Sequence, residues 1–172
     1  RKIKQRLGIS PDNDRKIILV SFGGLGFKEI DFYPLENLRR YNFIVTGPIV
    51  QTGENVITLP PELLRTEEIL YEDLVKAADL VVTKPGYGIV SECIANHTPL
   101  LYTSRGDFAE YQVLVKEMGR FISTLFIPQG DLKTGNWEPY LDQLLQTTTP
   151  TEIIGMDGAT IAAQFMIELT TK

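Results

Sequence analysis

The fold of this chain is constrained most by short, uninterrupted apolar runs that alternate with helical segments and with turns rich in glycine or proline. Residues 16–22 and 80–83 are the clearest of these runs, and each leads into a glycine-containing turn. A strand that is apolar at nearly every position is covered on both faces, as the strands of parallel sheets are. Alternation of such strands with helices predicts an α/β fold with an open parallel sheet wrapped on both faces.

The expected elements form a Rossmann-like, doubly wound sheet of about six strands. We predict strands at residues 16–22, 41–46, 55–59, 80–83, 99–103 and 121–127. We predict helices at residues 34–40, 71–78, 107–118, 137–145 and 159–169, and one further helix that carries Glu92. The basic segment 1–7 is either the end of a helix or a linker. Ligands of such sheets bind at the carboxyl ends of the strands, near the point where the strand order reverses.

The composition limits the classes of function. A length of 172 residues suits a single domain, 1–172, and the net charge of −5 argues against non-specific binding of nucleic acid or of an anionic membrane. No apolar run approaches the ~18 residues that span a bilayer and no signal peptide is visible, so we expect no transmembrane segment. The single cysteine and single histidine leave no zinc site and favour a reducing compartment, the cytoplasm.

The turn at residues 84–88, Lys-Pro-Gly-Tyr-Gly, joins the strand at 80–83 to the next helix. A strand that passes through glycines into a helix start exposes backbone N–H groups, which attract an anion such as a phosphate. Glu92 lies one helical turn after Gly88 on the same face and leans back toward the turn, where its carboxylate suits a ribose. A simpler interpretation stays open: a tight connection beside a solvated glutamate.

Two common phosphate-binding motifs are absent. No Gly-Lys-Ser/Thr ending marks a P-loop. The glycine-rich turn at residues 23–26 lacks the spacing of a dinucleotide fingerprint, and the second strand ends at Thr46 and Gly47, where a ribose-binding acid is expected. NAD is therefore disfavoured. What remains is a pair of glycine turns, after the first and fourth strands, with an acid in the helix that follows the second turn.

These motifs resemble the C-terminal, donor-binding half of a GT-B glycosyltransferase, near its MurG-like and UDP-glycosyltransferase-like branch. The resemblance covers essentially the whole chain. Its most specific part is the string Lys-Pro-Gly-Tyr-Gly-Ile-Val-Ser-Glu, and it is carried further by residues 21–24, 78–82, 99, 106–112 and 158–163. It implies a Rossmann-like domain that binds a nucleotide-sugar donor, usually a UDP-sugar, as its substrate and uses no cofactor.

The resemblance also implies which residues contact the donor. Glu92 would accept from the ribose hydroxyls, and Lys84 either neutralises phosphate or is a surface lysine. Asp107 and Glu110 stand where the family has an Asp-Gln or Gln-Gln pair that holds the sugar. Here Glu110 replaces an amide, which leaves the identity of the sugar open, and acids near a helix start are favourable in any case. Backbone groups of the glycine turns would cradle the diphosphate, namely those of Gly23, Gly24, Gly86, Tyr87 and Gly88.

Four further side chains are of types that often have a chemical role. Cys93 shares an arc with apolar residues, which indicates a small core residue rather than a nucleophile. His97 stands at a helix exit, where histidine is a routine partner of the helix dipole rather than a base. Trp137 is expected in the core or an interface. Tyr87 either packs over the glycine turn or stacks on a ligand.

No residue offers a convincing general base, so we assign no catalytic residue and no metal ligand. In an inverting enzyme of this family that base comes from the N-terminal, acceptor-binding domain, which we expect to lie outside this chain. The chain is then the donor-binding half of a hexosyltransferase, inactive alone, that works with a missing N-terminal domain or a partner subunit. Two alternatives stay open: a non-catalytic regulatory or interaction module, of the kind fused to sugar kinases, and one half of a UDP-sugar 2-epimerase.

Overall fold

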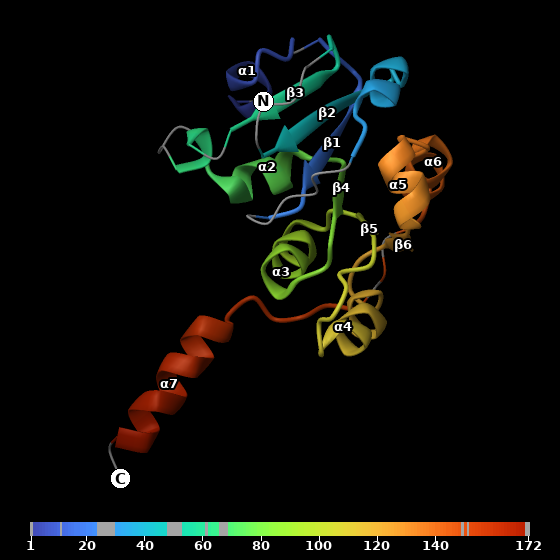
Figure 1. The fold of residues 1–172 in the computed structure, drawn as a ribbon. Helices are drawn as coiled ribbons and strands as arrows, with labels where there is room; N and C mark the ends of the chain where they lie inside the picture. The colour runs from blue at the N-terminus through green and yellow to red at the C-terminus, as the bar shows by residue number, and fades with distance from the viewer. Residues whose placement is uncertain are drawn as a thin grey trace.

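The structure is a computed structural model that describes residues 2–10, 12–23, 30–47, 53–60, 62–65, 69–148, 150 and 152–170. In these residues, six strands form one parallel sheet with the order β3-β2-β1-β4-β5-β6 (Figure 1). This is the order of a Rossmann-type sheet, which reverses between β1 and β4. The predicted α/β class, the doubly wound parallel sheet and its strand number are confirmed.

Every predicted strand is present, and the bounds of the first five agree closely. The strands are β1 (Lys16–Ser21), β2 (Tyr41–Thr46), β3 (Val56–Leu59), β4 (Leu80–Thr83), β5 (Leu100–Tyr102) and β6 (Thr124–Phe126). The largest difference is at the start of β6. The N–H groups of Phe121 and Ile122 donate to the carbonyl of Met118, so these residues close the preceding helix instead of extending the strand.

The sheet is buried on both faces because successive side chains of a strand point to opposite sides. In β1, Ile17 and Leu19 belong to one apolar core, whereas Ile18 and Val20 belong to the other. All four side chains are fully buried. Burying one such side chain stabilises the fold by about 1.5–3 kcal/mol, which explains why this run is apolar at every position.

Two layers of helices cover these faces. The first packs α1 (Lys2–Arg6), α2 (Tyr71–Ala77), α3 (Tyr87–Asn96), α4 (Tyr111–Met118) and the short 3-10 helix η2 (Leu63–Arg65) against the core that holds Leu19. The second packs the 3-10 helix η1 (Tyr33–Asn37), α5 (Gln129–Thr134) and α6 (Glu138–Leu145) against the core that holds Val20. The ribbon view shows α5 and α6 on the side of the sheet opposite α2 and α3 (Figure 1).

The predictions from the sequence were wrong for two helical segments. Residues 34–40 do not form an α-helix, because the N–H groups of Leu35 and Leu38 donate to carbonyls three residues back, which is the 3-10 pattern of η1. Helix α5 was not predicted at all. It has six residues and a single buried apolar side chain, Leu132, so it shows no helical periodicity in the sequence.

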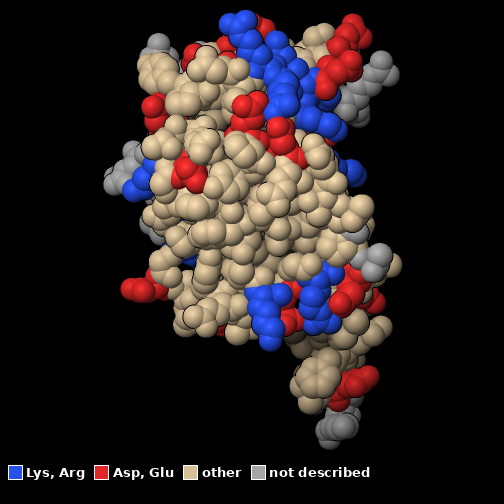
Figure 2. All heavy atoms as spheres, turned by 90° about the vertical axis from the view of Figure 1, so that its right-hand side faces the viewer, with Lys and Arg blue, Asp and Glu red and all other residues tan. Residues whose placement is uncertain are grey.

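The predicted closing helix is present as α7 (Gly158–Thr170), but it does not cover the sheet. All residues from 152 to 170 are exposed, and α7 extends away from the body of the molecule (Figures 1 and 2). Charged side chains are sparse on this extension. Its large apolar side chains are each more than half exposed, namely Ile161, Phe165, Met166, Ile167 and Leu169.

None of the helices among the described residues is long and apolar enough to cross a membrane.

We expect Leu101→Ala to lower the free energy of unfolding by about 2–5 kcal/mol, because Leu101 is fully buried in β5 and its truncation leaves a cavity. Urea denaturation measures this, followed by the fluorescence of Trp137, the single and fully buried tryptophan. Val113→Ala is the control: Val113 is 64% exposed, and its substitution should change stability by less than about 0.5 kcal/mol. Equal stability of the two variants would contradict the assignment of β5 to the core.

Candidate functional site

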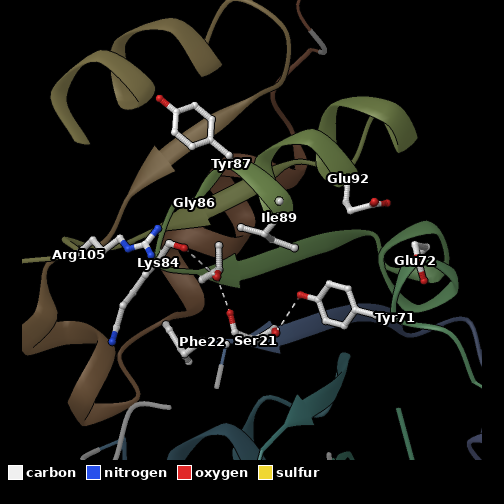
Figure 3. Close-up of a pocket in the computed structure, with 13 residues that line it drawn as sticks. Ser21, Phe22, Tyr71, Glu72, Lys84, Gly86, Tyr87, Ile89, Glu92 and Arg105 are labelled. Carbon is white, nitrogen blue, oxygen red and sulfur yellow. Dashed lines mark hydrogen bonds between the residues drawn. The ribbon is translucent and has the colours of Figure 1, made fainter. Parts of the chain in front are cut away.

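A cavity of about 650 Å³ lies at the carboxyl ends of β1 and β4, the point where the strand order reverses (Figure 3). Ligands of open α/β sheets bind at this position. Its walls come from the ends of β1 and β4, the starts of α2 and α3, and the loop after β5. The lining residues are Ser21, Phe22, Gly23, Tyr71, Glu72, Thr83, Lys84, Gly86, Tyr87, Gly88, Ile89, Glu92 and Arg105.

Hydrogen bonds fix the floor of this cavity. Tyr71 and Thr46 both donate to the Ser21 hydroxyl, at 2.9 and 2.8 Å, and Thr83 Oγ1 donates to the Ser21 carbonyl at 2.5 Å. Ser21 is 4% exposed and lines the cavity, so with two donors already directed at its oxygen it keeps its own proton for an acceptor. Burial raises the pKa of Tyr71, which keeps its phenol protonated as a donor.

The glycine turn at residues 84–88 forms a second wall. Gly86 is the N-cap of α3 and has no side chain to cap it, and the first N–H with an intrahelical acceptor is that of Val90, which bonds to the Gly86 carbonyl at 3.0 Å. The N–H groups before Val90 therefore have no acceptor within the helix. A Cβ on Gly88 would meet no atom within 4 Å, so this position faces open space. Together these groups can bind an anion.

Gly23 follows the end of β1 by two residues and lines the same cavity. Its φ of +71° lies in the left-handed region, which side chains with a Cβ adopt at a cost of about 1–2 kcal/mol. Glycine at this position therefore lets the chain leave β1 without closing the cavity.

Charged side chains are separated along the cavity. Figure 3 shows Lys84 and Arg105 on one side and Glu92 and Glu72 on the other, with Tyr71 near the glutamates. Glu92 is half-buried on the face of α3 that lines the cavity, as its spacing from Gly88 predicted. The cationic side suits phosphate, and the acidic side suits groups that donate hydrogen bonds, such as ribose hydroxyls.

Most of the predicted binding residues are brought together here. The cavity is lined by Gly23, Lys84, Gly86, Tyr87, Gly88 and Glu92. Gly24 lies outside the described residues. Asp107 and Glu110 are exposed on the loop between β5 and α4 and are not among the lining residues. Glu110 instead accepts a hydrogen bond from the Tyr87 phenol, which raises the pKa of that phenol.

Sequence reasoning missed other residues that line the cavity, chiefly Ser21, Tyr71, Glu72 and Arg105. A signal existed for two of them. Ser21 ends β1, and Arg105 follows β5 by three residues, so both stand at the carboxyl edge where ligands of such sheets bind. No sequence signal singled out Tyr71 and Glu72, because α2 reaches the cavity through its packing against α3 and β1.

The reactive side chains of the sequence lie elsewhere. Cys93 is fully buried in the core, as expected. His97 ends α3 in a left-handed conformation, with φ of 53°, about 15 Å along the helix from Tyr87 at its start, and is not among the residues that line the cavity. Trp137 is fully buried and donates to the Leu132 carbonyl at 2.8 Å. No group of three or more His, Cys, Asp or Glu side chains that could hold a metal ion occurs in the part of the chain that the structure describes.

The fold defined by this sheet is that of GT-B glycosyltransferases, as the sequence motifs predicted. Three solved structures share it: the glycosyltransferase SnogD from Streptomyces nogalater (TM-score 0.55, 18% identity), the glycotransferase of kitacinnamycin (0.59, 16%) and CalG4, the calicheamicin glycosyltransferase (0.54, 18%). The matches cover 79–80% of this chain and 36–37% of each solved chain. At these identities they establish the fold alone.

One curated protein is related in sequence. The L-arabinokinase of Arabidopsis thaliana is 26% identical over 171 residues, which is 98% of this chain and 15% of that protein. No family model matches the sequence. The chain therefore spans only part of the length of each protein that it resembles.

We expect the thiol of Cys93 to react about a thousandfold more slowly with a disulfide reagent in the folded chain than in the unfolded chain at pH 8. Burial raises the pKa of this thiol to about 12, whereas an unfolded cysteine titrates near 8.5. The reactive thiolate is thus scarce in the folded state at pH 8. Absorbance of the released thiol, with and without denaturant, measures both rates; equal rates would contradict the buried position of Cys93.

Proposed function

We propose that this chain is the donor-binding domain of a glycosyltransferase and that its donor is a nucleoside diphosphate sugar, with UDP-sugars as the first choice. The observation that carries the proposal is the cavity at the β1–β4 reversal, with backbone N–H groups of the 84–88 turn at one side and Glu92 at the other. A diphosphate needs N–H donors and positive charge, and a ribose needs an acceptor for its hydroxyls. Both kinds of group line this one cavity.

In this proposal the diphosphate lies between the two glycine turns, where Ser21 donates its proton to a phosphate oxygen. The ribose hydroxyls donate to Glu92, and the base lies toward Tyr71 and Glu72 at the start of α2. The sugar extends toward the loop that carries Asp107 and Glu110. The MurG-like and UDP-glycosyltransferase-like branch of the fold is the one that this arrangement favours.

Sugar transfer in this proposal requires a second part. The acceptor and the general base belong to an N-terminal domain or partner subunit, and residues 1–172 act as a single binding domain. Support comes from the length of the related structures, of which the chain covers 36–37%. The buried thiol of Cys93 fits a reducing compartment, and the cytoplasm is the location we propose.

A second candidate is a non-catalytic module linked to a sugar kinase. The observation in its favour is the 26% identity to L-arabinokinase, which extends over 98% of this chain. In such a module the cavity would bind a sugar nucleotide as a regulator rather than as a donor. A third hypothesis is one half of a UDP-sugar 2-epimerase, which would also need a bound nucleotide.

We expect Glu92→Ala to weaken the binding of UDP by about tenfold to a hundredfold, because it removes a charged acceptor worth roughly 1.5–3 kcal/mol. Isothermal titration calorimetry with UDP and with UDP-glucose measures the change. Glu62→Ala is the matched control, since Glu62 is an exposed glutamate outside the cavity. Unchanged affinity in Glu92→Ala would remove Glu92 from the ribose site.

We expect this chain by itself to bind the donor without transferring sugar. The measurement is the release of UDP from UDP-sugars in the presence of simple sugar acceptors, compared with a blank. The same chain should bind UDP in calorimetry, which separates a missing acceptor site from a lost donor site. Release of UDP above the blank would place the general base within residues 1–172 and contradict this expectation.

A further inference from the structure

Arg105 is a cationic residue of this cavity to which the resemblance assigned no role. It lies in the loop between β5 and α4 and reaches back across the sheet edge to the glycine turn. Its Nη1 donates to the Pro85 carbonyl at 3.0 Å. A Cβ built on Gly86 would lie 2.5 Å from the same Nη1, so the guanidinium packs directly against Gly86 and would have to shift if this position carried a side chain. The close approach gives Gly86 a packing role in addition to its place in the turn.

A chain of side-chain contacts holds this guanidinium in place. Its Cζ lies 4.4 Å from the centroid of the Phe108 ring, within the range of cation–π attraction. Phe108 meets the Tyr87 ring edge to face, at 6.3 Å and 75°. The Tyr87 phenol is hydrogen-bonded to Glu110. The loop after β5 and the start of α3 thus fix Arg105 together.

No carboxylate in the described parts of the chain balances the charge of Arg105, whereas three other arginines have carboxylate partners. Arg15, Arg40 and Arg120 each pair with one or two carboxylates. Within the described parts of the chain, no carboxylate forms an ion pair with Arg105. Its guanidinium instead contacts the Pro85 carbonyl and the Phe108 ring.

These contacts leave most of its donors available. A guanidinium has five N–H donors in one plane, and the Pro85 carbonyl takes one of them. The contact with Phe108 places the guanidinium carbon over the aromatic ring and involves no oxygen acceptor. The other N–H groups belong to the same guanidinium, and Arg105 lines the cavity on the same side as Lys84 (Figure 3). A fork of N–H donors of this kind matches the paired oxygens of a phosphate.

We propose that Arg105 binds the diphosphate of the ligand and that Phe108 is the positioning residue that orients its guanidinium. The inference rests on the proposed function for the choice of a nucleoside diphosphate, and it adds the group that selects a diphosphate over a nucleoside. Lys84 supplies a second positive charge on the same side of the cavity. The site then prefers UDP to UMP and UMP to uridine, because each phosphate adds charge facing Arg105 and Lys84.

Calorimetry on the full chain with four probes tests this: UDP, UMP, uridine and inorganic pyrophosphate. In Arg105→Gln we expect binding of UDP and pyrophosphate to weaken by about tenfold to a hundredfold, binding of UMP by less, and binding of uridine to stay unchanged. Arg105→Lys should restore part of the affinity, since it keeps the charge and loses the fork. The affinity of the wild-type chain for UDP should also fall more steeply with salt than that of Arg105→Gln.

Two further variants separate phosphate binding from a structural role. Phe108→Leu should reduce the preference for UDP over uridine without changing uridine binding, which a general loss of structure would not do. Arg39→Gln removes the same charge from an exposed site outside the cavity and should leave all four affinities unchanged. Circular dichroism and thermal melting verify that each variant is folded.

The outcomes separate this inference from the proposed function. Binding of UDP that is equally strong in the wild-type chain and in Arg105→Gln overturns the role of Arg105 alone. Binding of pyrophosphate that depends on Arg105, without any binding of UDP, supports the anion site and overturns the choice of nucleotide. A wild-type chain that binds neither UDP nor pyrophosphate overturns both.

Discussion

The pairing of β1 with β4 is the interaction on which the rest of the structure depends. These two strands lie side by side in the sheet although 58 residues separate the end of one from the start of the other, and their register joins Ile18 with Leu80 and Val20 with Val82. The side chains at this junction are fully buried, and Thr83 closes it by donating to the Ser21 carbonyl. Because the chain leaves β1 and β4 in opposite directions, their carboxyl ends frame a crevice that no other neighbouring pair in the sheet provides.

What the crevice can bind is decided by the groups around it rather than by the sheet. Glycine at positions 23 and 88 keeps the entrance open, and the first amides of α3, which have no acceptor within the helix, favour an anion on one side together with the charge of Arg105. Glu92 and Glu72 give the other side the opposite character. A ligand that carries phosphate at one end and hydroxyls at the other matches this separation of charge. A uniformly charged metabolite does not match it. The same polarity sets the orientation in which a nucleotide would enter.

The comparisons show why the site and not the fold must carry the functional argument. The GT-B fold is shared with three glycosyltransferases at 16–18% identity, whereas the related sequence at 26% identity is named a sugar kinase. A common fold hosts unrelated activities, so it narrows the ligand class without fixing the reaction. Helix α7, in contrast to the sheet, exposes its large apolar side chains. A 13-residue helix is marginally stable alone in water, and no described part of the chain covers its apolar surface.

The sequence by itself determined the architecture, because strands that are apolar at every position and glycine turns at their ends are local features. The alternation of apolar strands with helices predicted the parallel sheet, and residues 84–92 predicted the turn into α3 and the place of Glu92 beside it. It did not determine η1 or α5, whose short spans carry too little periodicity. Only the tertiary structure decided that Arg105 and Tyr71 line the cavity beside Ser21, that Asp107 and Glu110 do not, and that α7 leaves the body. Each of these depends on contacts between segments far apart in the chain, and such contacts follow from packing, which no local pattern encodes.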